Sequence, residues 1–576
     1  MIRKIAAISL LTAFIISVPT KGVLAGEKQT FDNLCLEILE TLQSFYPVRS
    51  TEMGIHAYDF LLADYSSGSV KKMIKKLRNY EKKLHNNFLN DDLSLHDRIN
   101  YKLIKSNVDI ALLELRRIRW YKKSPQLYID EAVNGIYFLT ISGHVPLHEK
   151  RAAILARMKS VPTLFRTARK NLKNPPSVWI ETALESLESG MCFYKEVAGE
   201  LMNKFPDQAD EILKVSTAAR EAMNDFTAYL AEIKTGDDTN FSIGRKNFDY
   251  KLSHEYFLDF DSDSLLKLGE TLIEDVNNAY AEYEDYLENH QNGQDSVFVP
   301  ANITKTDILD YYNWETRQIR TFLIQYDFIT IPEKIAPVTV IETPPFLRTM
   351  ISGIAYQPAG PFDSVQHGYF YVRPIPEDIE RRQLEARYRY VHRRGFKGSV
   401  VHEAYPGHHL QMQLAGLNND PVRKWQQNIM MIEGWALYCE EEMYHAGLYG
   451  DEDPVQWLGI LRGIRFRAAR IIADVKLHTG RFTYDEGVDW MVEALDINTK
   501  SGRDFIKKEV RRYTFSPAYQ MSYLMGKLEI LRLRDAVMKR DSDKFSIMGF
   551  HDALLAEGSI PPTLMWEVME LKPPEM

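Results

Sequence analysis

Hydrophobic residues recur every three or four positions along most of the chain. In the stretch that begins at Ser66, Val70, Ile74, Leu77 and Leu84 fall on one face of a helix, and lysines occupy much of the rest. We interpret the lysines as a solvated helix face. The same periodicity predicts further helices at residues 96–118, 147–172, 178–203, 207–233, 263–288 and 305–325.

Strand signals are confined to about residues 327–375. The segments DFITIP, APVTVIETPP and HGYFYVRP combine β-branched and aromatic residues with Pro and Gly. Residues 287–302 have the composition of a loop, and helical periodicity resumes after the strand region and continues to about 540. We therefore predict a mainly α fold, in which residues 26–576 form one domain with a helical half to about 325 and a catalytic half from about 326 that begins with a small sheet.

The first 25 residues differ from the rest of the chain. Arg3 and Lys4 precede an apolar run, and Val23-Leu24-Ala25 places small residues before Gly26. This order is typical of a cleaved secretory signal, so we expect cleavage after Ala25 and a periplasmic or secreted protein. The alternative is an N-terminal membrane anchor, for which the apolar run is short. No Cys follows the cleavage site to carry a lipid.

Composition and charge narrow the class of protein and the partners that it could bind. The 576 residues carry a formal net charge of -8, with 45% hydrophobic and 26% charged residues, as in globular proteins. This balance gives no reason to expect nucleic acid or an anionic membrane as a partner. Cys35, Cys192 and Cys439 are too few for a disulfide framework, and we expect buried free thiols, although one bridge could form in an oxidising compartment.

Candidate chemistry appears at residues 400–411, VVHEAYPGHHLQ. A zinc-peptidase helix of the H-E-x-x-H type places two histidines four residues apart on one face. Here His402 is followed by His408 and His409, at spacings of six and seven. On a regular helix the first spacing points about 120° away and the second lies about 10 Å further along. An undistorted helix therefore cannot join these residues at one metal.

Pro406 and Gly407 indicate that the helix is distorted. Proline clashes with the carbonyl group four residues earlier, which is that of His402, and glycine adopts backbone angles closed to other residues. A bulge at residues 405–407 would bring His408 close to the position of the usual second histidine. The alternative is a helix that ends at Tyr405, followed by a surface turn with unrelated histidines.

A third ligand candidate lies 25 residues after His408. Glu433 interrupts the apolar first half of a predicted helix at 428–445, where an unpaired carboxylate would be costly. It is either a metal ligand or one partner of a buried salt bridge. Residues 440–442, three glutamates at the polar end, are expected on the surface. Glu403, next to His402, would face the open side of the metal as a general base.

Four segments carry a family resemblance: HEAYPGHHLQ, IEGWALY, RAARIIADVKLHTG and SPAYQMSYLMGKLEI. In this order they resemble the motifs of the bacterial family called "domain of unknown function 885", and the resemblance extends upstream to YPVRSTEMGIHAYDF. That family is similar to helical zinc peptidases of the gluzincin type, such as the thimet oligopeptidase and carboxypeptidase Taq groups. The resemblance implies a helical fold with a deep channel and one zinc ion per chain. It implies His402, His408 and Glu433 as ligands, Glu403 as the catalytic base, and no ligand role for His409.

Further site candidates are less sharply defined. Arg470, Asp474 and His478 share a helix face, and His478 is a candidate catalytic residue that contacts substrate or supports a metal ligand. Tyr523 recurs in the family motif and is chosen over Tyr513 and Tyr519 as a donor to the oxyanion, with a core tyrosine as the alternative. The sequence does not choose which arginine binds a substrate carboxylate; the candidates are Arg467, Arg470, Arg511 and Arg512.

These features together predict an exported zinc metallopeptidase whose partner is a peptide substrate. A channel-type fold favours short peptides, by analogy with the fold. One alternative is a zinc hydrolase acting on a non-peptide amide, and another is a catalytically inert peptide-binding protein. Glu403 argues against the last, because a binding protein needs no general base. The sequence does not indicate the oligomeric state.

Overall fold

The computed structural model describes residues 30–89, 93–141, 146–289, 297–344, 354–372, 374–392, 394–450 and 454–573. The predicted signal segment and its cleavage site lie outside these residues. Within them, no helix combines the length and the apolar character needed to cross a membrane. All three cysteines are free thiols; Cys35 and Cys439 are buried, whereas Cys192 is exposed on the surface, contrary to the expectation.

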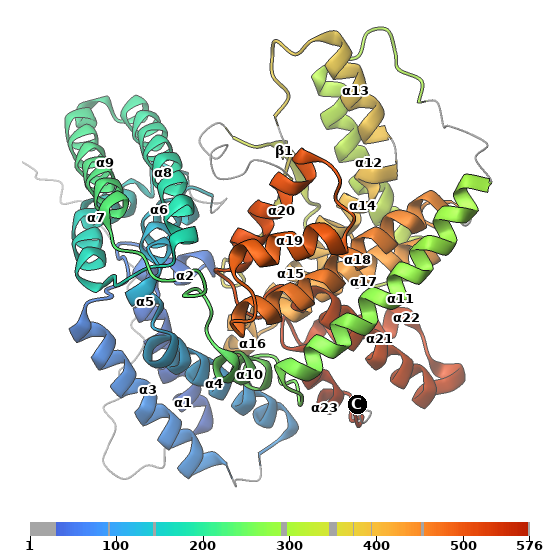
Figure 1. Ribbon diagram of the computed structural model, residues 1–576, viewed down its shortest axis with the longest axis horizontal. Coiled ribbons are helices and arrows are strands. Elements are labelled where there is room, and N and C mark those ends of the chain that lie inside the picture. The colour runs from blue at the N-terminus through green and yellow to red at the C-terminus, as the bar shows by residue number, and fades with distance from the viewer. Residues whose placement is uncertain are drawn as a thin grey trace, which may run out of the picture.

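Helices make up nearly all of the regular structure that precedes the sheet (Figure 1). In chain order they are α1 (Phe31–Phe45), α2 (Pro47–Glu52), η1 (His56–Tyr58), α3 (Ser67–Phe88), α4 (Leu95–Leu112), the π-helix η2 (Leu113–Ile118), α5 (Trp120–Lys123), α6 (Gln126–Ile141), α7 (Arg151–Asn171), α8 (Ser177–Lys204), η3 (Pro206–Gln208), α9 (Ala209–Glu232), α10 (Arg245–His254), α11 (Ser262–Asn289) and α12 (Lys305–Gln325).

The second half contains the sheet and then returns to helices. In chain order its elements are β1 (Thr339–Glu342), β2 (Ala355–Gln357), β3 (Tyr369–Val372), α13 (Arg381–His392), α14 (Arg394–Glu403), α15 (His408–Gly416), α16 (Pro421–Trp425), α17 (Ile429–His445), α18 (Pro454–His478), α19 (Tyr484–Ala494), α20 (Lys500–Tyr513), α21 (Ser522–Asp541), η5 (Ser542–Lys544), α22 (Ile547–Ala556), η6 (Pro562–Leu564) and α23 (Met565–Val568).

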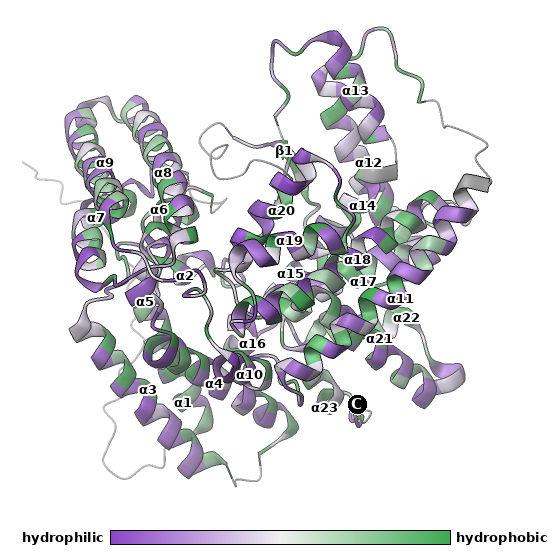
Figure 2. Cartoon of the chain, viewed as in Figure 1, coloured by the Kyte–Doolittle hydropathy of each residue, from purple (hydrophilic) through white to green (hydrophobic). Residues whose placement is uncertain are grey.

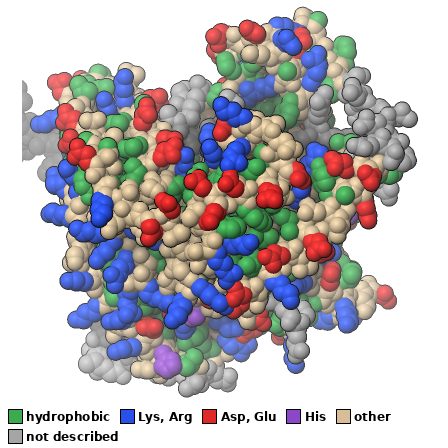
Figure 3. Space-filling model, viewed as in Figure 1, with side chains coloured by type: hydrophobic (Ala, Val, Ile, Leu, Met, Phe, Trp, Pro, Cys, Tyr) green, Lys and Arg blue, Asp and Glu red, His purple; other side chains and the backbone are tan. Residues whose placement is uncertain are grey.

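The helices predicted from periodicity are present. In α3, Val70, Leu77 and Leu84 are buried while Lys71 and Lys75 are exposed, as expected for a helix with a solvated lysine face. Figure 2 shows hydrophilic and hydrophobic residues alternating along the outer helices of this half. Figure 3 shows charged side chains of both signs on the visible face, with Lys and Arg more frequent than Asp and Glu at the lower left.

The sheet lies inside the predicted region but differs from the prediction in detail. Its strand order is β1-β3-β2, with β1 parallel and β2 antiparallel to β3. The segment DFITIP forms no strand; its Thr330 amide and hydroxyl instead donate hydrogen bonds to the Asp552 carboxylate, the amide at 2.9 Å. Strand β2 comes from a segment without a strong strand signal, and it is held by the edge of β3.

Two glycines allow a close helix crossing in the C-terminal half. Helix α17 packs along α21, and Gly434 of α17 meets Gly526 of α21. A Cβ atom built on Gly526 would lie 1.9 Å from the Met430 carbonyl oxygen, and one on Gly434 would lie 2.5 Å from the Gly526 backbone. Both contacts are with backbone, so neither neighbour can rotate away. This crossing fixes the part of α17 that carries Glu433, the residue before Gly434.

Replacing Gly526 by Ala should therefore lower stability by about 1–3 kcal/mol, because the added methyl group must push two helix backbones apart. Gly199 of α8 is the matched control, since a Cβ there meets nothing within 4 Å. Gly199→Ala should be neutral or stabilise by about 0.5–1 kcal/mol through helix propensity. Thermal unfolding of both variants measures the contrast, and equal midpoints would contradict the tight crossing.

Candidate metal centre

The zinc-helix motif is interrupted in the structure. Helix α14 ends at Glu403 and α15 begins at His408, and residues 404–407 between them are buried. The Tyr405–Pro406 peptide bond is cis. The Tyr405 hydroxyl accepts a hydrogen bond from the Val338 amide at 3.3 Å. The histidines therefore do not lie on a surface turn, and the predicted departure from a regular helix is present.

Gly407 makes this interruption tight. Its amide donates to the Val401 carbonyl oxygen at 3.0 Å, so the chain turns back over the end of α14. A Cβ atom at this position would lie 1.8 Å from the His402 carbonyl oxygen and 2.4 Å from that of Val401. No larger residue fits without moving the backbone. The missing side chain thus allows α15 to start directly beside His402.

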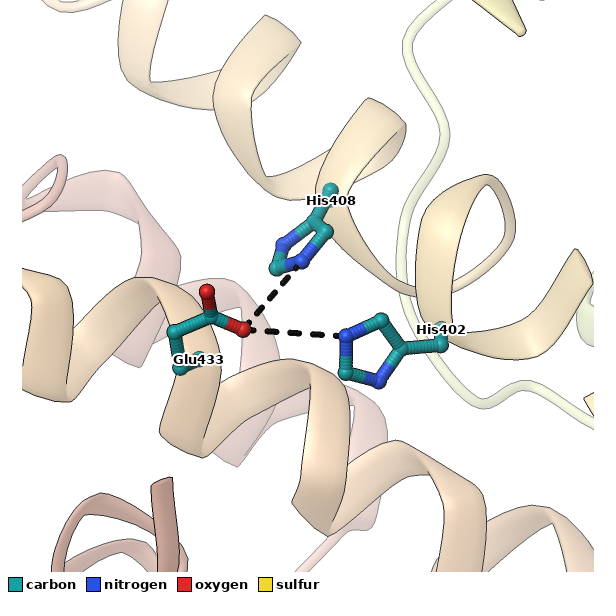
Figure 4. A group of neighbouring side chains, drawn as sticks. All are labelled: His402, His408 and Glu433. Atoms are coloured by element: carbon teal, nitrogen blue, oxygen red, sulfur yellow. Dashed lines mark ion pairs between the residues drawn. The ribbon is translucent and has the colours of Figure 1, made fainter. Parts of the chain in front are cut away.

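His402, His408 and Glu433 converge at this point (Figure 4). The Glu433 Oε2 atom lies 3.6 Å from His402 Nε2 and 3.5 Å from His408 Nε2. The three candidate ligand atoms all lie within 4.8 Å of one another. Among the described residues, this is the group of His, Cys, Asp and Glu side chains that could hold a metal ion.

The donor set fits a zinc-type ion. The two Nε2–Oε2 separations exceed the roughly 2.7–3.2 Å of a direct hydrogen bond. Two ligands each about 2.0–2.2 Å from one tetrahedral ion lie about 3.3–3.6 Å apart. Two imidazoles and one carboxylate also leave a fourth position open, which is the pattern of catalytic rather than structural zinc sites.

Glu440 supports one of the histidines. It lies two turns after Glu433 on α17, and its Oε1 atom is 2.7 Å from His402 Nδ1. A carboxylate on the far nitrogen of a metal-binding histidine orients the ring and raises its basicity. The expectation that Glu440 is a surface residue was wrong. The seven-residue spacing from Glu433 placed both on one helix face, but only the tertiary contact shows that His402 lies there.

The electrostatics of the centre favour a cation. Burial on its own disfavours the imidazolium, but Glu433 and Glu440 outweigh it and raise the pKa of His402 to about 10. Burial on its own would raise the pKa of Glu433, but His402 and His408 hold that pKa well below its usual range. Glu433 and Glu440 therefore favour a positive charge at this point.

Tyr519 binds the third ligand candidate. Its hydroxyl donates to Glu433 Oε1 at 2.9 Å. The Tyr523 ring lies 5.9 Å from the Tyr519 ring, and burial together with Glu433 raises the pKa of Tyr523 to about 12. Tyr513 is fully buried and binds Arg470 and Glu509 instead. Sequence reasoning chose Tyr523 and missed the direct contact of Tyr519.

Asp474 holds the turn that carries Tyr519. Its carboxylate accepts hydrogen bonds from the amides of Ala518 at 3.0 Å, Gln520 at 3.0 Å and Met521 at 3.3 Å. Ala518 has a positive φ of 64°, a conformation that costs energy for a residue with a side chain. Three amide donors to one carboxylate compensate for that cost. Asp474 therefore positions Tyr519 rather than pairing with an arginine on its own helix.

His478 does not lie with the other site candidates. Its ring is fully buried between Phe241 and Phe248, and its Nε2 atom binds the Tyr513 carbonyl oxygen at 2.9 Å. Burial lowers the pKa of His478 to about 3. Among the described residues, its hydrogen bond and ring contacts are with none of the three candidate ligands, His402, His408 and Glu433. This placement supports a role in anchoring the end of α20, not the predicted contact with substrate.

Glu403 and one of the four arginines border the same cavity. A cavity of about 460 Å³ is lined by His402, Glu403, Glu440 and Arg467. Arg467 approaches Glu440 to 3.8 Å, and its buried Nε has no hydrogen-bond partner among the described residues. The other candidates are engaged elsewhere: Arg470 and Arg512 pair with Glu509, and Arg511 pairs with two glutamates of α8.

His409 has structural partners. It is fully buried, its Nδ1 lies 3.1 Å from the Tyr356 hydroxyl, and its Nε2 lies 3.1 Å from the Ala336 carbonyl oxygen. Burial lowers the pKa of His409 to about 3. The structure thus separates the two adjacent histidines: His408 points toward Glu433, and His409 ties α15 to the segment before β1.

The sequence of the chain matches the model of one known protein family. Residues 47–569 match the model of a family described as "Bacterial protein of unknown function (DUF885)". The chain belongs to this family. Its match includes the segment around α2 as well as the metal centre, so both halves of the fold are part of the family pattern. No curated protein matches the chain.

Two solved structures share the fold of this DUF885 chain. One is described as "a putative lipoprotein of unknown function from Shewanella oneidensis"; it is 20% identical, with a TM-score of 0.73, over 94% of this chain and 100% of that one. The other, described as "the putative lipoprotein from Colwellia psychrerythraea", is 18% identical, with a TM-score of 0.73, over 94% of this chain and 98% of that one. At these identities the likeness establishes the fold alone.

Metal analysis of two histidine variants tests the ligand set. His408→Ala removes a ligand and should leave well under one zinc per chain after dialysis against buffered zinc. His409→Gln changes a residue whose contacts are structural and should keep zinc at the wild-type level. Elemental analysis of folded protein, with circular dichroism as the folding check, gives both values. Full zinc in His408→Ala would exclude this triad.

The Glu440 contact predicts a graded effect. Glu440→Gln keeps the shape of the side chain but removes the charge beside His402 Nδ1, and zinc affinity should fall about 10- to 100-fold. Glu442→Gln is the matched control, because Glu442 lies on the same helix and pairs with Arg534. Competition with a zinc chelator measures both affinities. An unchanged affinity in Glu440→Gln would show that this contact does not support the ligand.

Proposed function

We propose that the protein is an exported zinc metallopeptidase that hydrolyses short peptides. The main support is the convergence of His402, His408 and Glu433 beside Glu403, at the edge of a cavity of about 460 Å³. Two histidines and a glutamate form the ligand set of zinc peptidases that keep one coordination position open. A general base at that open side is what amide hydrolysis requires.

The proposed chemistry assigns a separate task to each side chain. Bound zinc would polarise the scissile carbonyl group and lower the pKa of a water molecule. Glu403 accepts the proton of the attacking water and passes it to the leaving amine. Tyr523 donates a hydrogen bond to the developing oxyanion. We prefer Tyr523 to Tyr519 for this task, because the Tyr519 proton is already used in the bond to Glu433.

Arg467 is the proposed contact for a substrate carboxylate. It is the candidate arginine that lines the cavity next to Glu403, whereas the other three are held by Glu509 or by α8. Gly398 and Gly459 line the same cavity, and a Cβ atom on either would have no neighbour closer than 3.8 Å. This part of the cavity therefore has room for a peptide backbone beside the guanidinium.

The proposed export rests on the N-terminal segment. Arg3 and Lys4, the apolar run and the small residues up to Ala25 form the order of a cleaved signal. The two similar solved structures carry lipoprotein descriptions, which agrees with an envelope location. In this chain Gly26 follows Ala25, so we propose cleavage without lipid attachment, into the periplasm or the medium.

Exchange of the base tests the mechanism. Glu403→Gln should keep zinc and bind peptide while losing turnover by a factor of about 10²–10⁴, because the side chain keeps its shape but cannot accept a proton. Glu442→Gln should keep normal turnover. The assay is steady-state kinetics on a peptide library, with zinc measured on each variant.

The same assay separates the alternatives. Near-normal turnover in zinc-loaded Glu403→Gln would sink the proposed mechanism. Cleavage of acyl-amino-acid amides but of no peptide would indicate an amidohydrolase with the same centre. Zinc and peptide binding by the wild-type protein, without hydrolysis of any substrate, would indicate a binding protein.

A further inference from the structure

A second cavity reaches Tyr519, next to the candidate metal centre, from the side of the N-terminal half. This central cavity has a volume of about 520 Å³ and is bordered by α2, η2, α10 and the turn before α21. Tyr519 lines it, and the hydroxyl of the same residue binds Glu433. In Figure 1, α2 and α10 lie between the helices at the left and the helices of the catalytic half. A molecule in this cavity would therefore reach the neighbourhood of the triad.

The cavity is built on a rigid support. Arg157 of α7 is fully buried, and its guanidinium donates to the Thr51 hydroxyl at 2.6 Å and to the Gly135 carbonyl oxygen at 2.6 Å. These bonds fix α2 against α6 and α7. Helix α2, which presents the exposed side chains of Arg49 and Glu52 to the cavity, is thus anchored by a buried polar network.

The charged groups of the central cavity do not balance. Lys251 forms an ion pair with Glu255. Arg49, Glu52 and Glu114 make no ion pair or side-chain hydrogen bond among the described residues; Arg49 stacks over the Trp425 ring at 4.9 Å. Three carboxylates against two cationic groups leave one negative charge. A single organic cation would neutralise it.

The lining of the cavity also suits such a ligand. Its wall contains aromatic rings, those of Trp120, Tyr256 and Phe515. Aromatic faces attract ammonium groups and pack against the apolar parts of a peptide. A free inorganic ion would make no use of that wall.

We propose that the central cavity binds the ammonium group of a short peptide, with Glu52 and Glu114 as its counter-ions. The ammonium group is either the free N-terminus or a lysine side chain. The proposal rests on the proposed function in taking the substrate to be a peptide, and it adds the feature by which that peptide is recognised. A bound peptide would extend from Glu52 and Glu114, past Tyr519, to the triad.

Calorimetric titration with three peptides tests the cavity. The protein is the Glu403→Gln variant, with and without zinc, so that binding is read without turnover. The probes are tri-alanine, N-acetyl-tri-alanine and N-acetyl-Ala-Lys-Ala. Tri-alanine should bind at least about tenfold more tightly than its acetylated form, because acetylation removes the ammonium charge. Recovery of affinity with the third probe would assign the site to a lysine side chain, and no recovery would assign it to the N-terminus.

Variants of the charged residues that line the cavity show whether it binds a cationic or an anionic group of the peptide. Glu52→Gln and Glu114→Gln, each in the same background, should weaken the amine-bearing probe about tenfold and leave N-acetyl-tri-alanine unchanged. Glu188→Gln, on the exposed face of α8, is the matched control and should change neither. Equal affinity for tri-alanine and its acetylated form would overturn the proposal. Loss of binding in Arg49→Gln with both glutamate variants unaffected would also overturn it, because the site would then read an anion.

Failure of the cavity proposal can be distinguished from failure of the proposed peptidase function. Wild-type protein that cleaves peptides but binds acetylated and free peptides equally would keep the proposed function and refute the cavity. Glutamate-dependent binding of tri-alanine, without hydrolysis of any peptide by the wild-type protein, would do the opposite.

Discussion

The candidate metal centre depends on the close approach of the Gly407 backbone to the carbonyl group of His402. A regular helix would carry His408 away from His402, and a helix that simply ended would leave the two rings free to diverge. Because Gly407 has no side chain, the chain folds back over the last turn of α14 and starts α15 at once. The two Nε2 atoms then face a single carboxylate oxygen.

Helices α17 and α18 hold this arrangement from two sides. Helix α17 supplies Glu433 and, two turns later, Glu440, and its position is set by the glycine crossing with α21. Helix α18 supplies Asp474, which holds the turn before α21 and so places Tyr519 on Glu433. Each candidate ligand described here is thus oriented by a neighbour, except that His408 Nδ1 has no partner among the described residues.

The sequence predicted what is local in the chain. Helical periodicity located most helices, and the residues between His402 and Glu433 were enough to suggest the ligand set and the distorted helix. It could not predict Glu440, because three adjacent glutamates at the polar end of a helix look alike until the position of His402 is known. Nor could it rank Tyr519 and Tyr523, which lie only four residues apart, one in the turn before α21 and the other in α21. Their order depends on a turn fixed by Asp474, far away in the chain.

The candidate metal centre and the central cavity differ in how far apart in the chain their residues lie. The candidate ligands fall between residues 402 and 433, so only short loops must close before the three can meet. The central cavity joins residue 49 to residue 519, and its walls cannot exist until both ends of the chain have docked. The centre has low contact order and the cavity has high contact order. Forming the cavity therefore carries a larger loop-closure entropy cost than bringing the three candidate ligands together.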